Sequence, residues 1–218
     1  MKTTYFITGT DTDAGKTFVS RLILKQLNQY QPTIGYKPIA AGAELIDGQW
    51  RNDDALILQQ ASEPVQAYDV INPICFPQAI APHIASSLNQ APITLSQLDS
   101  WWMQVRDNSK VSLIEGAGGW RLPLNEKDYL SDFVKTWQFE VIVVVGMKLG
   151  CLNHALLTIE AIKADGLKIK GWVANQLDTP MPQYDENLAY LTQCIDVPLL
   201  GEVKSHQTSC ATSDLFSF

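Results

Sequence analysis

The chain has 218 residues, which fits one domain with a full core or at most two small ones, and its composition, 46% hydrophobic and 18% charged, excludes a long disordered tail. Its formal net charge of -7 argues against nucleic acid or an anionic membrane as a partner, although a small cationic site is compatible with it. The cysteines form no C-x-x-C pair, so we expect reduced thiols in a cytoplasmic protein. The N-terminus lacks the features of a signal peptide, and the longest strongly apolar run, residues 141–146, is too short to cross a bilayer.

Short apolar runs rich in β-branched residues predict the strands, and their continuous apolarity indicates a parallel sheet buried on both faces. Stretches with helical periodicity lie between them, so the alternation predicts an α/β fold with right-handed crossovers, as one domain over residues 1–218. We expect residues 61–93, which carry five prolines, to form a long surface excursion. The predicted strands are 3–8, 33–37, 111–115, 140–146, 170–175 and 198–203, and the predicted helices are 16–30, 95–105, 153–164 and 186–194.

The stretch GTDTDAGKT, residues 9–17, follows the first predicted strand and leads into the first predicted helix. This is the context of a phosphate-binding loop, in which backbone N–H groups and a helix N-terminus form an anion site. Lys16 would neutralise the β- and γ-phosphates, and the Thr17 hydroxyl would bind Mg²⁺. The alternative is an ordinary strand-to-helix turn in which Asp13 is a favourable N-terminal charge.

Two aspartates in this loop need an explanation, because carboxylates repel phosphate. Asp11 and Asp13 can point outward if the N–H groups point inward. They would then be free to meet a cationic substrate group or a ribose near the γ-phosphate. This pattern favours a partner that carries amines.

A second glycine-rich turn follows the strand at 111–115, in the sequence EGAGG. Glu115 ends that strand and is a candidate to hold the magnesium ion, while the glycines would let the backbone approach a ligand. A polar strand end with a flexible turn is the alternative. Lys37 follows the second predicted strand, at the same edge of a parallel sheet, and could stabilise a transferring phosphoryl group. Taken alone, Lys37 is equally compatible with a solvated surface charge.

Further polar residues are candidates for this edge. In RNDDAL, Asn52 or Asp53 could cap the following helix, while Asp54 could reach the magnesium ion; the residue pattern leaves this open. The stretch KLGCLNH, residues 148–154, turns from a strand into a helix and offers free N–H groups, and Asn175 ends the next strand. The three histidines have no metal-ligand spacing, and we expect Trp101 and Trp102 to pack, with one of them facing inward.

Taken together, the motifs resemble the dethiobiotin synthetase family. The stretches GTDTDAGKT, GYKPIAAG, RNDDAL, NPICF, APHIA, EGAGGW, VVGMKLGCLNHAL, GWVAN and PLLGE occur in the family's order, over nearly the whole chain to about residue 203. The resemblance implies a P-loop NTPase fold with a mostly parallel sheet of about seven strands and helices on both faces. It also implies a cytoplasmic homodimer that converts 7,8-diaminononanoate, CO₂ (or bicarbonate) and MgATP into dethiobiotin, ADP and phosphate.

The resemblance further implies the roles of individual residues. Lys16 and Lys37 would stabilise the carbamate and phosphoryl charge, and Thr17, Asp54 and Glu115 would hold Mg²⁺. The diamine would meet Thr12, Lys37 and the position of Ala41, and its distal carboxylate would bind Gly150, Cys151 and Asn153 of the partner subunit. The nucleotide contacts implied are Asp13, Ala14, Gly15, Lys16, Thr17, Asp54, Glu115, Gly116, Ala117, Gly118, Asn175, Gln176, Lys204, Ser205 and His206.

Two departures from the family pattern stand out. Many members carry a hydroxyl or amide side chain where this chain has Ala41, so a direct contact with the carbamate is missing. The family's proline after G-E-[IL] is replaced by Lys204, which leaves the adenine-side loop and the nucleotide preference open.

Two other classes compete with this interpretation. A P-loop switch or partitioning ATPase usually carries an additional lysine early in the loop and often a basic membrane- or DNA-binding element, which this acidic chain lacks. A glutamine-dependent amidoligase of related fold needs a glutaminase with a nucleophilic cysteine, and 218 residues leave no space for one.

Overall fold

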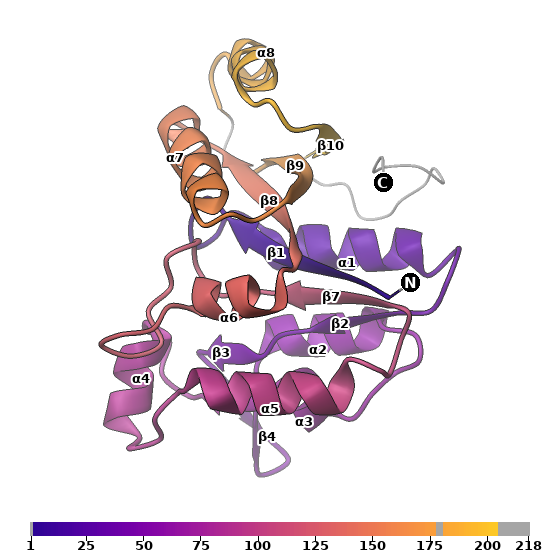
Figure 1. Cartoon of the computed structure of the whole chain (residues 1–218), viewed down its shortest axis with the longest axis vertical. Coiled ribbons are helices and arrows are strands. Elements are labelled where there is room, and N and C mark those ends of the chain that lie inside the picture. The colour runs from indigo at the N-terminus through magenta and orange to yellow at the C-terminus, as the bar shows by residue number, and fades with distance from the viewer. Residues whose placement is uncertain (1, 178–180, 205–218) are drawn as a thin grey trace.

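A parallel sheet of six strands organises the computed structural model, which describes residues 2–177 and 181–204 (Figure 1). The order across the sheet is β10-β9-β8-β1-β7-β2, and every neighbouring pair is parallel. All six predicted strands are confirmed, and the described part of the chain has one strand fewer in this sheet than the roughly seven that the resemblance implies. The strands are β1 Thr3–Gly9, β2 Thr33–Tyr36, β7 Val111–Glu115, β8 Glu140–Met147, β9 Ile169–Gln176 and β10 Leu199–Val203.

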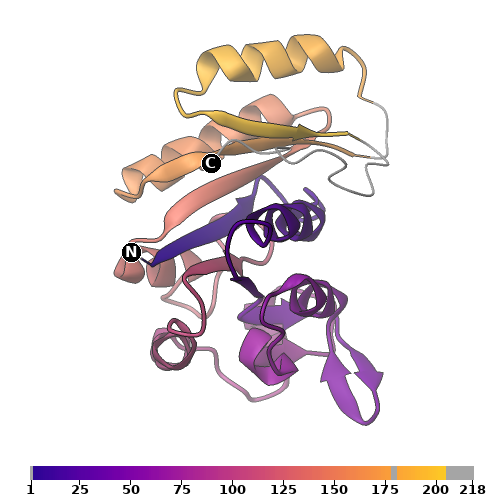
Figure 2. The same cartoon turned by 90° about the vertical axis from the view of Figure 1, so that its right-hand side faces the viewer.

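Helices cover both faces of this sheet, as its two-sided apolarity requires (Figures 1 and 2). Successive residues of β1 serve opposite faces: Phe6 packs into the cluster under α5, α6 and α7, whereas Tyr5 and Ile7 pack against α1. The helices are α1 Lys16–Leu27, α2 Asp53–Ala61, α3 Tyr68–Ile71, α4 Pro82–Leu88, α5 Leu95–Val105, α6 Leu130–Trp137, α7 Cys151–Ala164 and α8 Tyr184–Cys194.

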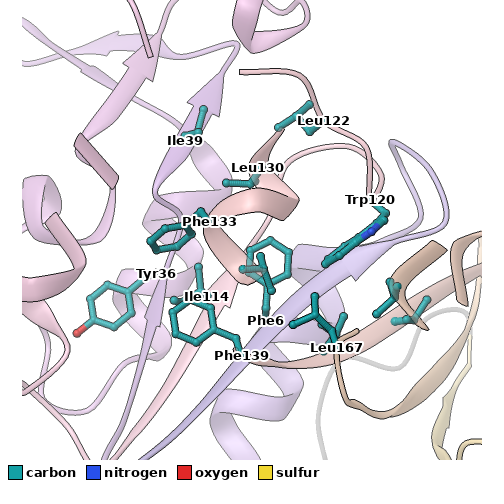
Figure 3. Packing of buried hydrophobic residues seen from close by; sticks show 14 of the residues in the cluster. Phe6, Tyr36, Ile39, Ile114, Trp120, Leu122, Leu130, Phe133, Phe139 and Leu167 are labelled. Atoms are coloured by element: carbon teal, nitrogen blue, oxygen red, sulfur yellow. The ribbon is translucent and has the colours of Figure 1, made fainter. Parts of the chain in front are cut away.

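Aromatic side chains fill the larger of the two cores (Figure 3). Trp101 and Trp102 are both buried, so the expectation that only one faces inward was wrong. The reason is the position of α6, which the sequence did not predict. Phe133 from α6 and Phe139 beyond it lie beside the two indole rings, at centroid distances of 6.4 Å and 5.2 Å.

The first helix is shorter than its periodicity predicts. It ends at Leu27, and the expected stripe residue Tyr30 is 65% exposed. Asn28 explains the stop, because its side chain accepts a hydrogen bond from the Thr33 N–H and donates one to the Ala61 carbonyl. These bonds turn the chain directly into β2.

The proline-rich excursion is more ordered than predicted. It contains α3, α4 and the short strand β6 Ile74–Phe76, which pairs in parallel with β3 Ile39–Ala41. An antiparallel hairpin, β4 Glu44–Ile46 and β5 Gln49–Arg51, projects from the body of the molecule (Figures 1 and 2). Within the described residues, none of the helices is long and apolar enough to cross a membrane.

Because the main sheet is parallel, the carboxyl ends of its strands meet at one edge. Gly9, Tyr36, Glu115 and Met147 therefore end their strands near one another, and the loops that follow them build the site.

Candidate active site

The loop of residues 10–15 connects β1 to α1 and leaves the start of the helix open to an anion. Gly15 is the N-cap residue, with a left-handed φ of 82°, and no side chain accepts a hydrogen bond from the first turn. The free N–H groups and the positive end of the helix dipole therefore face the loop's interior. The geometry is that of a phosphate-binding loop.

Two neighbouring strands hold this loop from behind. Asn175, at the end of β9, donates a hydrogen bond of 2.9 Å to the Ala14 carbonyl and is buried. A Cβ atom on Gly15 would lie 2.1 Å from the Asn175 side-chain nitrogen, and one on Gly146 would lie 2.9 Å from Ala14 Cα. These close contacts leave no space for a side chain at either glycine.

Lys16 curls back over the loop, and its ammonium group donates to the Asp11 carbonyl at 3.2 Å. Burial and, to a smaller extent, the positive charge of Lys37 lower the pKa of Lys16 to about 8, although nearby carboxylates oppose both effects. A phosphate would restore the preference for the charged form.

Lys37 is the centre of a second part of the site, which is built mainly from charged side chains. Its ammonium group donates to Glu115 at 2.7 Å, to Asp54 at 2.9 Å and to the Gly116 carbonyl at 3.2 Å. The residue is 3% exposed. Lys37 is therefore a buried, paired cation, and the alternative of a solvated surface charge was wrong.

The charges of this cluster stabilise one another. Burial by itself lowers the pKa of Lys37, but the carboxylates of Glu115 and Asp54 outweigh it, so the pKa is above its ordinary value. Burial raises the pKa of Asp54, and the Lys37 ammonium outweighs that effect, so this pKa is below its ordinary value. Both groups are charged at neutral pH.

Helix α2 brings Asp54 to this cluster, and the structure resolves which residue caps it. Asn52 is the N-cap, since its side chain accepts a hydrogen bond of 3.3 Å from the Ala55 N–H. Asp53 is exposed, whereas Asp54 points at Lys37 and lines the cavity described below. The helix cap, Asn52, and the acid that pairs with Lys37, Asp54, are therefore separate residues.

The oxygen atoms needed for a magnesium ion gather beside the phosphate loop. The Thr17 hydroxyl donates to Glu115 Oε1 at 2.7 Å. Glu115 Oε2 is buried and has no hydrogen-bond partner among residues 2–177 and 181–204. No group of three acidic, histidine or cysteine ligands occurs in that same part of the chain. The residues present therefore fit an ion that also takes phosphate oxygens as ligands, as Mg²⁺ does with a nucleotide.

The glycine turn after β7 packs closely against β1. A Cβ atom on Gly116 would lie 2.9 Å from the Phe6 ring, and Gly118 has a left-handed φ of 61°. Behind the turn, Trp120 and Arg121 both donate hydrogen bonds to Asp165, at 2.8 Å and 2.7 Å for the shortest bonds. The turn is thus held against the sheet, with its backbone toward the cavity.

A cavity of about 700 Å³ joins these parts. Many predicted site residues line it: Thr12, Asp13, Gly15, Lys16, Thr17, Lys37, Ala41, Asp54, Ala117 and Gly118. Sequence reasoning missed residues 79–82, at the start of α4, as part of the wall. The signal was present in the motif APHIA, but a proline-rich excursion gives no periodicity that would place it over the site.

Other predicted residues do not line the cavity. Ala14, Glu115 and Gly116 lie directly behind its wall, through the bonds and close contacts given above. Asn175, Gln176 and Lys204 are at the ends of β9 and β10, and Asn175 supports the loop backbone. Ser205 and His206 lie outside the described residues.

The two aspartates of the phosphate loop, Asp11 and Asp13, were both expected to be free to meet a ligand, and the structure differs for one of them. Asp11 is not free to meet a ligand amine, because its carboxylate pairs with Lys148 at 2.9 Å. That ammonium, which hydrogen-bonds to the carboxylate, lowers the pKa of Asp11 despite a smaller opposing effect of burial. Asp13 has a left-handed φ of 58° and lines the cavity.

The Asp11–Lys148 pair connects the loop to the start of α7. Gly150 is the N-cap of that helix, with a φ of 95° and no side-chain cap, and Cys151 begins the helix two residues earlier than predicted. Gly150, Cys151 and Asn153 are not among the residues that line the cavity of the same chain. Leu149, beside them, is 93% exposed.

The fold and the loop define a P-loop NTPase. The septum site-determining protein MinD from Pyrococcus horikoshii, solved with Mg-ADP, has a TM-score of 0.57 at 17% identity, covering 93% of this chain and 81% of that one. A ParA family ATPase from Chlorobium tepidum has a TM-score of 0.56 at 12% identity, covering 95% and 86%. At such identities the likeness concerns the fold alone.

The sequence comparisons are more specific. Residues 3–211 match the family described as an AAA domain. The ATP-dependent dethiobiotin synthetase BioD of Alteromonas mediterranea is 48% identical over 98% of this chain and 96% of its own length. The protein of the same name from Vibrio parahaemolyticus is 46% identical over 91% and 88%. The chain belongs to the ATP-dependent dethiobiotin synthetase family.

Proposed function

We propose that this protein is an ATP-dependent dethiobiotin synthetase, which joins 7,8-diaminononanoate and CO₂ into a cyclic urea and converts ATP to ADP and phosphate. The observation that carries the proposal is the buried Lys37, held by Glu115 and Asp54 beside a phosphate loop on one cavity. Family membership supplies the substrates, and this geometry suits their chemistry.

In the reaction, an amine of the substrate takes up CO₂ and loses a proton, forming a carbamate. A carbamate oxygen attacks the γ-phosphorus and ADP leaves, which gives a carbamic–phosphoric anhydride. The second amine then attacks the carbamate carbon, closes the ring and expels phosphate. Negative charge passes between carbamate and phosphoryl oxygens, so cations fixed at that place lower the barrier.

Lys16 and Lys37 are the two cations proposed for this role. Lys16 extends from the phosphate loop and suits the β- and γ-phosphates. Lys37, which directly follows β2, also lines the cavity and suits the carbamate oxygen and the transferring group. Its pairing with two carboxylates keeps it protonated, so it acts as a fixed charge rather than as a base.

Thr17, Asp54 and Glu115 would hold Mg²⁺ together with phosphate oxygens, as their oxygen atoms allow. When bound, the ion would neutralise phosphate charge. Asp13, Ala14, Gly15, Ala117 and Gly118 would surround the phosphates with backbone N–H groups. Gly116, whose own N–H donates to the Ile7 carbonyl, would lie beside them. The proposed adenine contacts are Asn175, Gln176, Lys204, Ser205 and His206.

The diamine is proposed to lie along Thr12 and Ala41, opposite Lys37, on the wall that also includes residues 79–82. Its distal carboxylate would bind the uncapped start of α7, at Gly150, Cys151 and Asn153 of a partner subunit. The proposal therefore includes a homodimer in the cytoplasm. In its support, these residues do not line the cavity of their own chain.

A direct assay tests the function. The protein is incubated with MgATP, bicarbonate and 7,8-diaminononanoate, and phosphate and the cyclic urea are quantified. We expect both products in equal amounts, and neither when the diamine is omitted. Phosphate release that does not depend on the diamine, and instead requires a protein or DNA partner, would refute the assignment and favour a switch ATPase.

A further inference from the structure

Between Lys37 and helix α2 lies a buried network of polar side chains. Asn72 donates hydrogen bonds to the carbonyl groups of Lys37, at 2.5 Å, and Ile74, at 3.2 Å. The Tyr68 hydroxyl donates to Asn72 Oδ1 at 2.8 Å. The same hydroxyl accepts from the Asn52 backbone N–H at 2.7 Å. Tyr68, Asn72 and Asn52 are all at most 8% exposed.

This network connects the two residues of the Lys37–Asp54 ion pair through their backbones. At one end, Asn72 fixes the backbone of Lys37, which a bond from the Lys37 N–H to the Ile71 carbonyl (2.9 Å) also holds. At the other end, Tyr68 fixes Asn52, the N-cap of the helix that carries Asp54. The Tyr68 hydroxyl therefore connects the backbone of the lysine to the backbone of its carboxylate partner.

A cationic side chain packs on the ring of Tyr68. The guanidinium of Arg51 lies over its ring, 4.1 Å from the centroid, and pairs with Asp69. The hydroxyl donates to Asn72, accepts from Asn52 and also lies 3.7 Å from the Cys75 sulfur, in a buried part of the molecule. Removing the oxygen would leave the Asn52 N–H and Asn72 Oδ1 without this partner, in a place where neither can be solvated easily.

We propose that Tyr68 and Asn72 are positioning residues that set the place of the Lys37 ammonium relative to Asp54 and Glu115. Neither side chain lines the cavity, so they act through Lys37 and touch no substrate. The inference rests on the proposed function, because it assigns their effect to the step in which Lys37 stabilises charge. A displacement of that ammonium by a fraction of an ångström slows the chemistry and leaves the phosphate loop intact.

The test is the substitution Tyr68→Phe, compared with Tyr36→Phe as a matched control. Tyr36 is also buried, its hydroxyl donates to the Val105 carbonyl at 3.3 Å, and the residue does not line the cavity. Both changes remove one buried hydroxyl. We expect Tyr68→Phe to lower kcat about tenfold, with the KM for MgATP within about twofold, and Tyr36→Phe to change kcat less than about twofold.

Thermal unfolding of both variants separates positioning from general weakening. The proposal is overturned if Tyr68→Phe keeps its kcat, or if the two variants lose kcat in proportion to their losses in Tm. If Tyr68→Phe folds poorly, Asn72→Ser tests the same hydrogen-bond network at Asn72. The expected result is again a lower kcat with little change in the KM for MgATP. A wild-type protein without diamine-dependent turnover would instead refute the proposed function, which is a distinguishable failure.

Discussion

The phosphate loop and the Lys37 cluster face the same cavity but are built in opposite ways. The loop is contiguous, residues 9–17, and uses backbone groups, with a glycine whose Cβ position is already filled by Asn175. The cluster uses charged side chains from β2, α2 and β7, with Lys37 separated from its partners by 17 and 78 residues in sequence. Substitutions that add side-chain volume should therefore damage the phosphate loop most, and substitutions that remove a charge should damage the Lys37 cluster most.

Removing the charge of Lys37 should have the largest effect. We expect Lys37→Ala to lower kcat about 10³-fold, because the group that meets the developing charge is lost, with the Kd of MgATP within about threefold. The variant should also lose about 3 kcal/mol of folding free energy, chiefly because Glu115 stays buried without its cation. Single-turnover kinetics and nucleotide titration measure the two effects.

Lys135→Ala is the control for this experiment. That lysine is also paired with an acid, Asp132, but on a partly exposed helix surface that does not line the cavity, so its loss should change neither kcat nor ATP binding. If Lys37→Ala loses ATP binding as strongly as turnover, its assigned role in the chemistry is wrong.

The same contrast explains what the sequence could predict. The main strands, α1 and the loop follow from local signals, since apolar runs, a helical stripe and G-K-T lie within a few residues of one another. The parallel strands also explain why Lys37 and Glu115 share an edge. That Lys37 is buried and paired could not be predicted, because it depends on which helix packs beside β2 and on the direction of a single side chain.

Two other misses have the same physical origin. The periodicity of α6 is brief, so the sequence did not show that it covers the tryptophan pair on α5. The partner of Asp11 lies 137 residues away, at the end of β8, and no local pattern connects the two. Long-range pairing of side chains is decided by tertiary packing, which a single sequence does not display.

A side chain at Gly15 should break the loop. Gly15→Ala combines a left-handed φ of 82° with a Cβ only 2.1 Å from Asn175, so the loop must shift. We expect the affinity for MgATP to fall about 100-fold, because the N–H groups lose their common direction. Isothermal titration calorimetry measures this change.

Gly48→Ala provides the matched control. Gly48 has a similar φ of 76°, but nothing lies within 4 Å of its Cβ position. This variant should show only the conformational cost, about 1 kcal/mol in unfolding free energy, with unchanged ATP affinity. Equal losses of ATP affinity in both variants would mean that backbone strain, and not crowding, governs the loop.

The pH dependence of nucleotide binding reports on Lys16. In the nucleotide-free protein its pKa is about 8, below the ordinary lysine value, so the charged form is disfavoured and becomes neutral as the pH rises past 8. Phosphate requires the charged form, and binding above that pH must take up a proton. We expect the affinity for ATP to fall about tenfold from pH 7 to pH 9.

Lys16→Arg tests the cause of that fall, because arginine keeps its charge throughout this range. Its ATP affinity should be lower at pH 7 but nearly constant up to pH 9. A wild-type affinity that stays constant between pH 7 and pH 9 would contradict the assignment of a lowered pKa to Lys16.

The smallest expected effect is that of Asn175→Ala on ATP affinity, which distinguishes two possible roles of Asn175. Its hydrogen bond to the Ala14 carbonyl makes it a support of the loop, whereas the family resemblance makes it an adenine contact. Asn175→Ala removes one buried hydrogen bond, worth about 1 kcal/mol, so ATP affinity should fall about fivefold. If Asn175 acts by supporting the loop, the affinity for inorganic triphosphate, which lacks adenine, should fall by the same factor. A loss of affinity confined to ATP would favour the adenine contact.

The Asn175→Ala variant also frees the space beside Gly15. In that background, Gly15→Ala should therefore lower the free energy of unfolding no more than Gly48→Ala does. A double-mutant cycle of Gly15 and Asn175 measures this coupling directly.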